Sequence, residues 1–252
     1  KTTISLSTVL IIFISLNSFA QNDSIKKERY TAHNKGKFTI SWGGNRGYYT
    51  ESDIHFVGDD YNFVVQSAKA HDKPKGWHVD YVNPGRMTIP QTNFRMGYFI
   101  NDHYNISLGV DHMKYVMYQN KTVNYPNQGT YNENPTGNQL TLDEQFLTFE
   151  HTDGLNYINT EIARVDDISK LFKLPNTDKF QINTVAAVGV GLLFPKTNAK
   201  VLSKDRHDDF HVSGFGLSAK VGLNLTFFKY FFVEAELKGG YINMNDIRTT
   251  SE

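Results

Sequence analysis

Apolar and polar positions alternate along much of the chain, most clearly in its last third. Between Phe180 and Phe194 apolar side chains such as Val188 and Leu192 occupy every second position, with small or polar residues between them. The same period returns over 215–227 and 231–237. A period of two places successive side chains on opposite faces of a β-strand. The pattern predicts three long strands, each with one apolar face and one small, polar or charged face.

The length of these runs separates two all-β architectures. Strands of soluble domains average about five or six residues, and the first two runs are more than twice as long. A tilted membrane strand needs about 9–11 residues in the hydrocarbon, and a polar face rich in glycine suits the interior of a barrel. A soluble two-sheet sandwich is the alternative, with shorter strands. The runs therefore favour a transmembrane antiparallel up-and-down β-barrel.

Turn lengths predict the direction of each strand. Bacterial barrels have short periplasmic turns and long outer loops. Residues 58–60, 101–103 and 228–230 are short turns, and 71–92, 119–144 and 196–208 are long and polar. Residues 166–178 form a longer periplasmic connection with room for one helical turn. Nine strands follow, at 37–45, 52–57, 61–69, 93–100, 104–118, 145–165, 179–195, 210–228 and 230–243.

Nine is an odd number, whereas single-chain bacterial barrels have even numbers of strands. The sequence ends at Thr249–Glu252 without a final aromatic strand. We therefore expect residues 37–252 to be a barrel domain that is incomplete at its C-terminus. About ten strands are expected in the whole barrel, within a range of 8–12.

The first twenty residues differ from the rest of the chain. Lys1 is basic, Val9–Leu16 is apolar but too short to span a bilayer, and Ser18 and Ala20 are small residues before Gln21. This pattern predicts a signal peptide over 1–20, with a buried core helix as the alternative. Residues 21–36 are polar and charged and are expected to form a periplasmic N-terminal arm. Export and barrel strands together predict the cell outer membrane of a Gram-negative bacterium.

Composition narrows the function classes. The 26 Lys and Arg residues balance the 26 Asp and Glu residues, so nothing favours a nucleic-acid partner. The chain has no cysteine, which excludes disulfides and thiolate metal sites. No metal site is predicted, and no cofactor is indicated. The expected partners are outer-membrane lipid and, during biogenesis, the barrel-assembly and secretion machinery.

Two polar segments, Asp111–Tyr115 and Glu150–Tyr157, lie on consecutive strands that should pair. If Tyr118 pairs with Gln145, then His112 lies opposite His151, with an uncertainty of one or two residues. Strict alternation then divides the segments, and only a β-bulge would unite them on one face. Asp111, Glu150 and Thr152 are predicted to face inward, and His112, Lys114, His151 and Asp153 outward.

A histidine beside a carboxylate can act as a general base, and a neighbouring hydroxyl can act as a nucleophile. The candidate catalytic residues are His151, Asp111, Glu150 and Thr152. The candidate binding residues are His112, Lys114, Asp153 and Asn156. Opposite charges inside a small barrel also neutralise one another structurally, and this interpretation is favoured over catalysis and over ligand binding. The expected inward charges are Arg95, Asp111, Glu150, Lys220, Glu234, Glu236 and Lys238.

Several segments resemble a group of uncharacterised outer-membrane barrels of Gram-negative bacteria. They are the signal peptide ending in Ser18-Phe19-Ala20-Gln21, the strand Phe94–Ile100 with its Asn-Asp turn, and the segments Asp111–Tyr115 and Glu150–Tyr157. The resemblance implies the same barrel fold but no assigned activity.

A more distant comparison is with lipid A deacylases of the outer membrane, which carry a His, one further residue, and then a Ser followed by an Asn. Here His151 is followed by Thr152, and Asp153 stands where the Ser would be. No catalytic role is carried over from that family.

These observations predict an integral outer-membrane barrel with a structural, binding or transport role and no catalysis. The alternative is an outer-membrane hydrolase of lipid or glycolipid that uses the His and carboxylate residues of the fifth and sixth strands. The sequence identifies no substrate and no oligomeric state.

Overall fold

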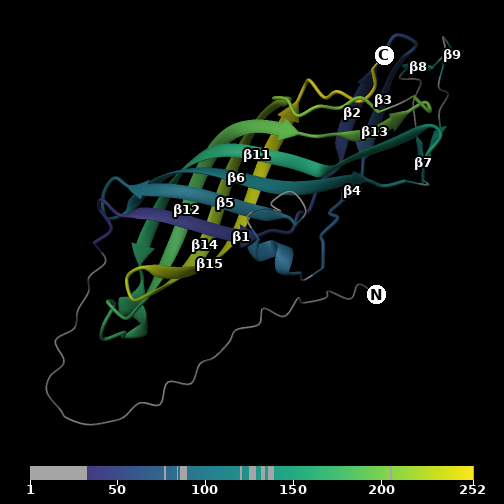
Figure 1. Ribbon diagram of the computed structural model, residues 1–252. Coiled ribbons are helices and arrows are strands. Elements are labelled where there is room, and N and C mark those ends of the chain that lie inside the picture. The colour runs from purple at the N-terminus through teal and green to yellow at the C-terminus, as the bar shows by residue number, and fades with distance from the viewer. Residues whose placement is uncertain are drawn as a thin grey trace, which may run out of the picture.

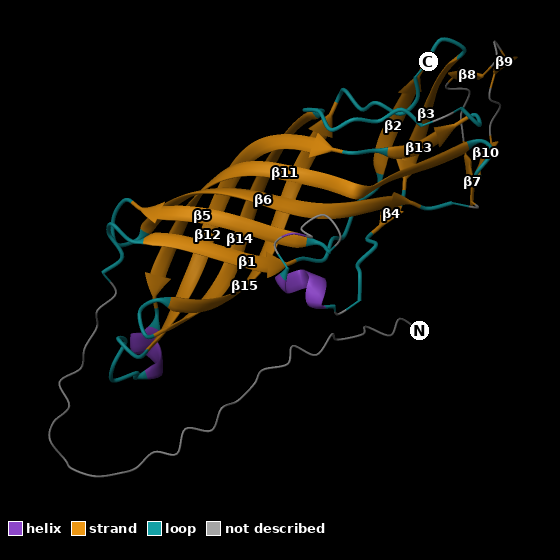
Figure 2. Cartoon of the chain, in the orientation of Figure 1, coloured by secondary structure: helices purple, strands orange, loops and turns teal. Residues whose placement is uncertain are grey.

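The computed structural model describes residues 33–251, except for positions 77, 84, 86–89, 120, 125–128, 132–133, 136–138 and 205. The predicted signal peptide and most of the predicted N-terminal arm lie outside the described residues. The described part of the chain is all-β, with short 3-10 helices as its helical elements (Figures 1 and 2). Among the described residues, no helix has both the length and the apolar character needed to cross a membrane.

A nine-stranded antiparallel sheet forms the body of the molecule. Seven of its strands follow one another in an up-and-down order, and the short strands β4 (Ala70–His71) and β13 (Asn198–Val201) extend β6 and β11. The seven are β1 (Phe38–Gly44), β5 (Thr92–Phe99), β6 (Tyr104–Met117), β11 (Leu147–Asp167), β12 (Phe180–Pro195), β14 (Gly214–Phe227) and β15 (Phe231–Met244).

The long strands predicted from alternation are confirmed. β12 has 16 residues and both β14 and β15 have 14, and each pairs along its whole length with its neighbour. β11 is longer still, with 21 residues. A 3-10 helix, η3 (Ser169–Phe172), lies in the connection at 166–178, where one helical turn was expected. A second, η1 (Val79–Val82), lies between β4 and β5.

The predicted strands at 52–57 and 61–69 exist as β2 (Ser52–Val57) and β3 (Tyr61–Ala68), but their predicted place in the strand order is wrong. β1 pairs directly with β5, and β2 and β3 belong to a separate four-stranded sheet with β8 (Gly129–Tyr131) and β9 (Asn134–Pro135). A two-stranded sheet joins β7 (Lys121–Asn124) to β10 (Gln139–Leu142).

The hairpin β2–β3 also lies at the opposite end of the sheet from the one predicted. Asp60, in its turn, pairs with Lys204 at 2.8 Å, and Lys204 belongs to a predicted outer loop. The physical reason is packing, because Phe63 and Val65 of β3 are fully buried in a core that includes side chains of β6 and β11. We call this end of the sheet the cap end, and the end with the turns at 101–103 and 228–230 the turn end.

The main sheet curves (Figure 1). Its two faces have the reverse of ordinary burial. Toward the turn end, apolar side chains on the convex face are exposed, including Leu237 at 77% and Val188 at 64%. Charged side chains on the concave face are buried, including Glu161 at 1% and Lys220 at 6%. Polar groups therefore occupy the interior there, and apolar groups the surface.

Candidate functional site

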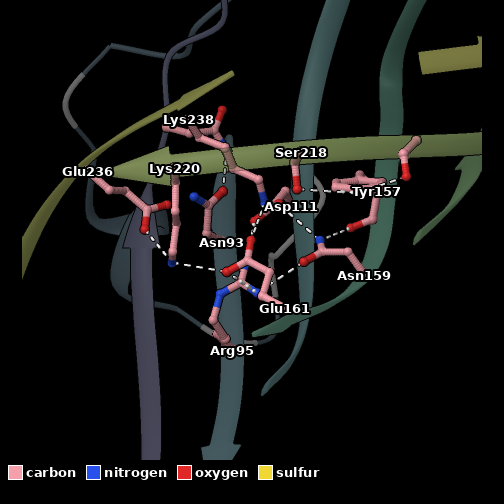
Figure 3. Close-up of polar contacts among 12 residues, drawn as sticks. Asn93, Arg95, Asp111, Tyr157, Asn159, Glu161, Ser218, Lys220, Glu236 and Lys238 are labelled. Carbon is pink, nitrogen blue, oxygen red and sulfur yellow. Dashed lines mark hydrogen bonds and ion pairs between the residues drawn. The ribbon is translucent and has the colours of Figure 1, made fainter. Parts of the chain in front are cut away.

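A network of charged and amide side chains lies on the concave face, midway along the strands (Figure 3). Each member occupies an alternate position that the pleat turns inward. We call it the polar network; its members are Arg95 of β5, Asp111 of β6, Asn159 and Glu161 of β11, Lys220 of β14, and Glu234, Glu236 and Lys238 of β15.

Glu161 is the centre of the polar network. Its carboxylate lies 2.7 Å from the Nζ of Lys238, 3.1 Å from the Nζ of Lys220 and 3.0 Å from the guanidinium of Arg95. Only 1% of this residue is exposed. A buried carboxylate persists in its charged form only where cations compensate for lost hydration, and here three do so.

Asp111 forms the second centre. Its carboxylate lies 2.5 Å from Lys238 and 3.3 Å from Arg95, and it accepts a hydrogen bond of 3.0 Å from the Nδ2 of Asn159. Arg95 also donates to the Oδ1 of Asn159 at 3.0 Å. The amide of Asn159 therefore bridges a cation and an anion and orients both.

The polar network links strands that are far apart in the sheet. Lys238 lies on β15 at one edge, whereas Asp111 lies on β6, the third strand from the other edge. Such a contact requires strong curvature, because strands in a flat sheet are about 4.8 Å apart. Three strands, β11, β12 and β14, lie between β6 and β15 along the sheet, so in a flat sheet Asp111 and Lys238 would be roughly 19 Å apart. The ion pairs thus hold the curved shape across the interior.

Neutral polar groups continue the network in both directions. Toward the cap end, the Tyr157 hydroxyl donates to the carbonyl of Gly216 at 3.1 Å, and Lys238 lies 5.1 Å from the centre of the Tyr157 ring. Toward the turn end, Asn183 donates to Asn224 at 3.2 Å. A hollow of about 770 Å³ opens there, bordered by both edge strands, β1 and β15.

An apolar cluster closes the cap end of the concave face. The hairpin β2–β3 covers it, and every member is at most 8% exposed. Its members are Phe56, Tyr61, Phe63, Val65, Ala68, Tyr115, Met117, Leu142, Leu147, Phe149, Leu155, Tyr157, Leu193, Ala199 and Val201.

The register of β6 and β11 differs from the predicted one by five residues from Leu155 onward and by three at His151. His112 lies opposite Asn156 rather than His151, and Tyr115 lies opposite His151. The register shifts between His151 and Leu155, where Gly154 adopts a φ of 149°. A Cβ at Gly154 would lie 2.8 Å from Asn156 Nδ2 and 3.2 Å from His112 Cε1, so this position requires glycine.

Because both differences are odd, the predicted faces are exchanged for Glu150 and His151 of β11. His151 faces inward, as its partner Tyr115 does, and the prediction that it faces outward is wrong. Glu150 lies opposite Val116, on the other face from Asp111, so its predicted inward position is also wrong. The Thr152 hydroxyl donates to the Glu150 carboxylate at 2.9 Å, and Thr152 lies on the same face as Glu150.

The candidate catalytic residues are therefore not brought together. Asp111 and His151 share the concave face, but the Tyr115 partner of His151 is four residues from Asp111, roughly 13 Å along the strand. Glu150 is held outside by Asn198 at 2.9 Å and Lys73 at 3.3 Å. The bulge that the hydrolase hypothesis required is present, yet it does not align these groups.

The candidate binding residues lie apart from the polar network, on the cap side of the exposed apolar positions. The Nδ1 of His112 is 2.7 Å from the Oδ1 of Asn156, which in turn donates through Nδ2 to the carbonyl of Phe194. Asp153 lies 3.8 Å from Arg206 in the loop before β14. Lys114 is partly buried, and its carbonyl accepts from the Tyr49 hydroxyl at 2.7 Å.

His151 is buried in the apolar cluster, beyond the exposed apolar positions of β11. Its ring lies 4.9 Å from Phe149 and 5.9 Å from Tyr115, and its Nδ1 is 3.2 Å from the Thr197 hydroxyl. The Nε2 has no hydrogen-bond partner among the described residues. Burial lowers the pKa of His151 to about 4, against a smaller opposing effect of Glu150. The imidazole is therefore neutral at physiological pH and has an unsatisfied buried nitrogen.

Sequence reasoning found six of the inward charges and missed Glu161, the central one. Arg95, Asp111, Lys220, Glu234, Glu236 and Lys238 are inward as predicted. The missed signal was the alternation at Tyr157, Asn159 and Glu161, which continues the inward polar positions of β11. Within the described residues, no group of three or more His, Cys, Asp or Glu side chains could hold a metal ion.

Comparisons of the chain with models of protein families, with curated proteins and with solved structures gave no significant match.

Proposed function

We propose that this protein is an integral outer-membrane β-barrel with a sealed interior, and that its role is structural or binding rather than catalytic. The observation that carries the proposal is the reversed burial of the main sheet. Val188, Leu217 and Leu237 are half or more exposed, whereas Asp111, Glu161 and Lys220 are at most 6% exposed. A surface of this kind is costly in water and favourable in lipid.

The exposed apolar positions form a continuous belt around the convex face. It crosses every strand of the seven-strand path. Five of these strands have 14 to 21 residues, more than the 9–11 or so that hydrocarbon requires, whereas β1 has 7 and β5 has 8. The belt includes Phe38, Ile40, Met96, Tyr98, Ile106, Leu108, Ile158, Ile162, Val188, Val190, Leu192, Leu217, Val221, Leu223, Phe231, Val233 and Leu237.

The ends of the belt favour a defined membrane position. Toward the cap end, the last exposed apolar position on β6 is Leu108, four residues from His112. On β11 it is Ile158, two residues from Asn156. Beyond these positions the interior changes from polar to apolar, as expected for a part of the chain that lies in water. This places Leu147–Leu155 beyond the hydrocarbon. Because bacterial barrels have short periplasmic turns and long outer loops, and the short turns 101–103 and 228–230 lie at the turn end, we assign the cap end to the outside.

The interior favours a sealed barrel over a channel. The polar network crosses the concave face, and the apolar cluster covers its cap end. Open porins have about sixteen to eighteen strands, many more than the seven on this path. Transport through a wide aqueous pore is the role that this arrangement supports least.

The test expresses the complete reading frame in a Gram-negative host and follows the protein in outer-membrane fractions. We expect membrane association that resists alkaline extraction, a change in gel migration on boiling in detergent, and little ion conductance in planar bilayers. Recovery as a soluble periplasmic protein would refute the membrane proposal. Stable conductance like that of a porin would refute the sealed interior.

The hydrolase alternative gains no support from the geometry, since the His and carboxylate groups that it needs are separated. Mass spectrometry of lipid A species from cells with the protein and with its His151→Ala variant tests it directly. We expect identical lipid species in both.

A further inference from the structure

The two edges of the main sheet are unpaired among the described residues. β1 is bonded only to β5, and β15 only to β14. Because each of the seven strands runs antiparallel to the next, the first and the seventh run in the same direction. The edges are thus two parallel rows of backbone N–H and C=O groups.

The two edges also face a common space. The hollow of about 770 Å³ is lined by Lys37–Gly44 at one edge and by Lys229–Glu234 and Glu236 at the other. A Cβ added at Gly43 of β1 would meet nothing within 4 Å. The space between the edges is therefore open beside all of β1 and beside the Phe231–Glu236 part of β15.

A lipid environment does not tolerate such edges, because unpaired backbone groups have no hydrogen-bond partner in hydrocarbon. Direct pairing of β1 with β15 would be a parallel contact in an otherwise antiparallel sheet. Two inserted strands would also leave one parallel contact. One inserted strand, antiparallel to both edges, satisfies the direction of each.

We propose that one further β-strand of the same polypeptide fills this space and closes an eight-stranded barrel. A strand that runs from the cap end to the turn end can follow β15 or precede β1 through a turn, so it needs no crossover connection. This inference rests on the proposed membrane role, which is the reason that the edges must be paired.

The surroundings define the chemistry of the inserted strand. Its outward side chains must be apolar, because they lie between Phe38 and Ile40 on one side and Phe231 and Val233 on the other, all of them more than half exposed. Its inward side chains fill the hollow and must be mostly small or polar.

Charge limits the number of basic residues among the inward side chains. The polar network contains three cations and four carboxylates, since Arg95, Lys220 and Lys238 face Asp111, Glu161, Glu234 and Glu236. Glu234 and Glu236 border the hollow and share Lys220, at 3.8 and 2.7 Å. Lys37 and Lys229 line the same hollow, so at most one Lys or Arg is expected on the inserted strand.

The experiment measures the width of the space with paired cysteines introduced into the full-length protein, because the 252 residues contain no native cysteine. Ile40→Cys is combined in turn with Phe231→Cys, Val233→Cys and Ala235→Cys. A disulfide needs Cα atoms within about 7 Å, whereas one intervening strand places the edges roughly 10 Å apart. We expect no disulfide, and efficient linking by a bifunctional thiol reagent that spans roughly 10 Å.

The chain provides matched controls. Val190 and Leu217 are direct partners on β12 and β14, so the double cysteine variant should form a disulfide. Thr160 lies opposite Val190 on β11, so Thr160→Cys with Leu217→Cys reports one intervening strand. The edge pair should behave as this second control does.

Each outcome decides the proposal. Linking by the 10 Å reagent at monomer mass, with the two controls as described, supports it. A disulfide between β1 and β15, linking only by reagents roughly twice as long, or linked species of dimer mass each overturn it. Mass spectrometry of photo-cross-links from Ile40 should identify a strand with alternating apolar residues, and a segment without that pattern also overturns it. Membrane fractionation is scored separately, so a closed but soluble protein refutes the membrane role alone.

Discussion

The same concave face is polar over one half and apolar over the other, and the change occurs within about four residues of each strand. On β6 the inward side chains are Asn105, Ser107 and Asp111 toward the turn end, and Tyr115 and Met117 toward the cap end. On β11 the polar residues Glu161 and Asn159 give way to Leu155, Phe149 and Leu147. Interior chemistry therefore follows what surrounds the sheet, being polar where the surface is apolar and apolar where the surface is polar.

This comparison gives each half a different stabilising interaction. Toward the turn end, ion pairs hold the interior, while toward the cap end, packing of aromatic and aliphatic side chains does so. The two halves should respond differently to loss of charge, loss of apolar volume and change of pH.

Loss of the central carboxylate should have the largest effect. Glu161→Gln leaves Arg95, Lys220 and Lys238 without their shared partner, and breaking a buried ion pair in this way costs about 3–5 kcal/mol. Urea unfolding in phospholipid vesicles measures the change. Glu236→Gln is the control, since Glu236 is about a quarter exposed and also contacts Lys220. An equal effect of both variants would show that Glu161 is not the centre.

Loss of apolar volume should have the second-largest effect, and the effect should differ between the cap and the belt. Leu155→Ala in the apolar cluster should cost about 2–5 kcal/mol, because Leu155 is fully buried. Leu237→Ala makes the same change on the exposed belt, where no core cavity forms. Hydrogen exchange should show lower protection of β2 and β3 for the first variant alone. Equal loss of protection in both variants would contradict the assignment of cap and belt.

A charge on the belt should have an effect that an equally exposed charge outside it lacks. Val188→Arg should destabilise the membrane-inserted protein by about 2–4 kcal/mol, the usual cost for Arg near the middle of a bilayer. Val57→Arg on β2 is the control, since Val57 and Val188 are both 64% exposed. Insertion yield and unfolding in vesicles measure both. Similar results would mean that the belt does not face lipid.

Acid should weaken the cap end with the smallest effect of the four. The pKa of His151 is lowered by burial to about 4 in the folded protein, so the unfolded chain takes up a proton first as the pH falls below its ordinary value of 6.5. Stability is therefore present at neutral pH and falls by about 2 kcal/mol between pH 7.5 and pH 5. Hydrogen exchange of β11 and β13 at the two pH values measures the change.

His151→Gln is the matched variant for acid, because glutamine retains polar groups near Thr197 but does not titrate. In this variant, hydrogen-exchange protection of β11 and β13 should be the same at both pH values, apart from pH effects that do not involve residue 151. A wild-type cap that is insensitive to pH over this range would exclude His151 as the responsible group.

Local pattern was sufficient for the strands but not for their pairing. The period of two in β12, β14 and β15 is a property of adjacent residues, so it could be seen in the sequence. The separate sheet of β2 and β3 could not, because burial of Phe63 depends on contacts with Phe56 of β2 and Phe146 before β11. Their alternation is that of any strand with one buried face.

The candidate site shows the same limit. The inward charges followed from parity along each strand, and most were predicted. The register of β6 with β11 depends on the irregularity between His151 and Leu155, and on the space that Gly154 leaves beside His112. An odd error in register exchanges the two faces, which is why His151 and Glu150 were assigned to the wrong ones.

The length of β11 has a mechanical consequence. This strand of 21 residues belongs to both halves, since it pairs with β13 near the cap and with β6 and β12 toward the turn end. A pull on the cap along the strand direction loads many of these hydrogen bonds together, in shear, rather than opening them one after another. A pull on the cap would therefore be resisted by many hydrogen bonds at once and carried into the body of the sheet.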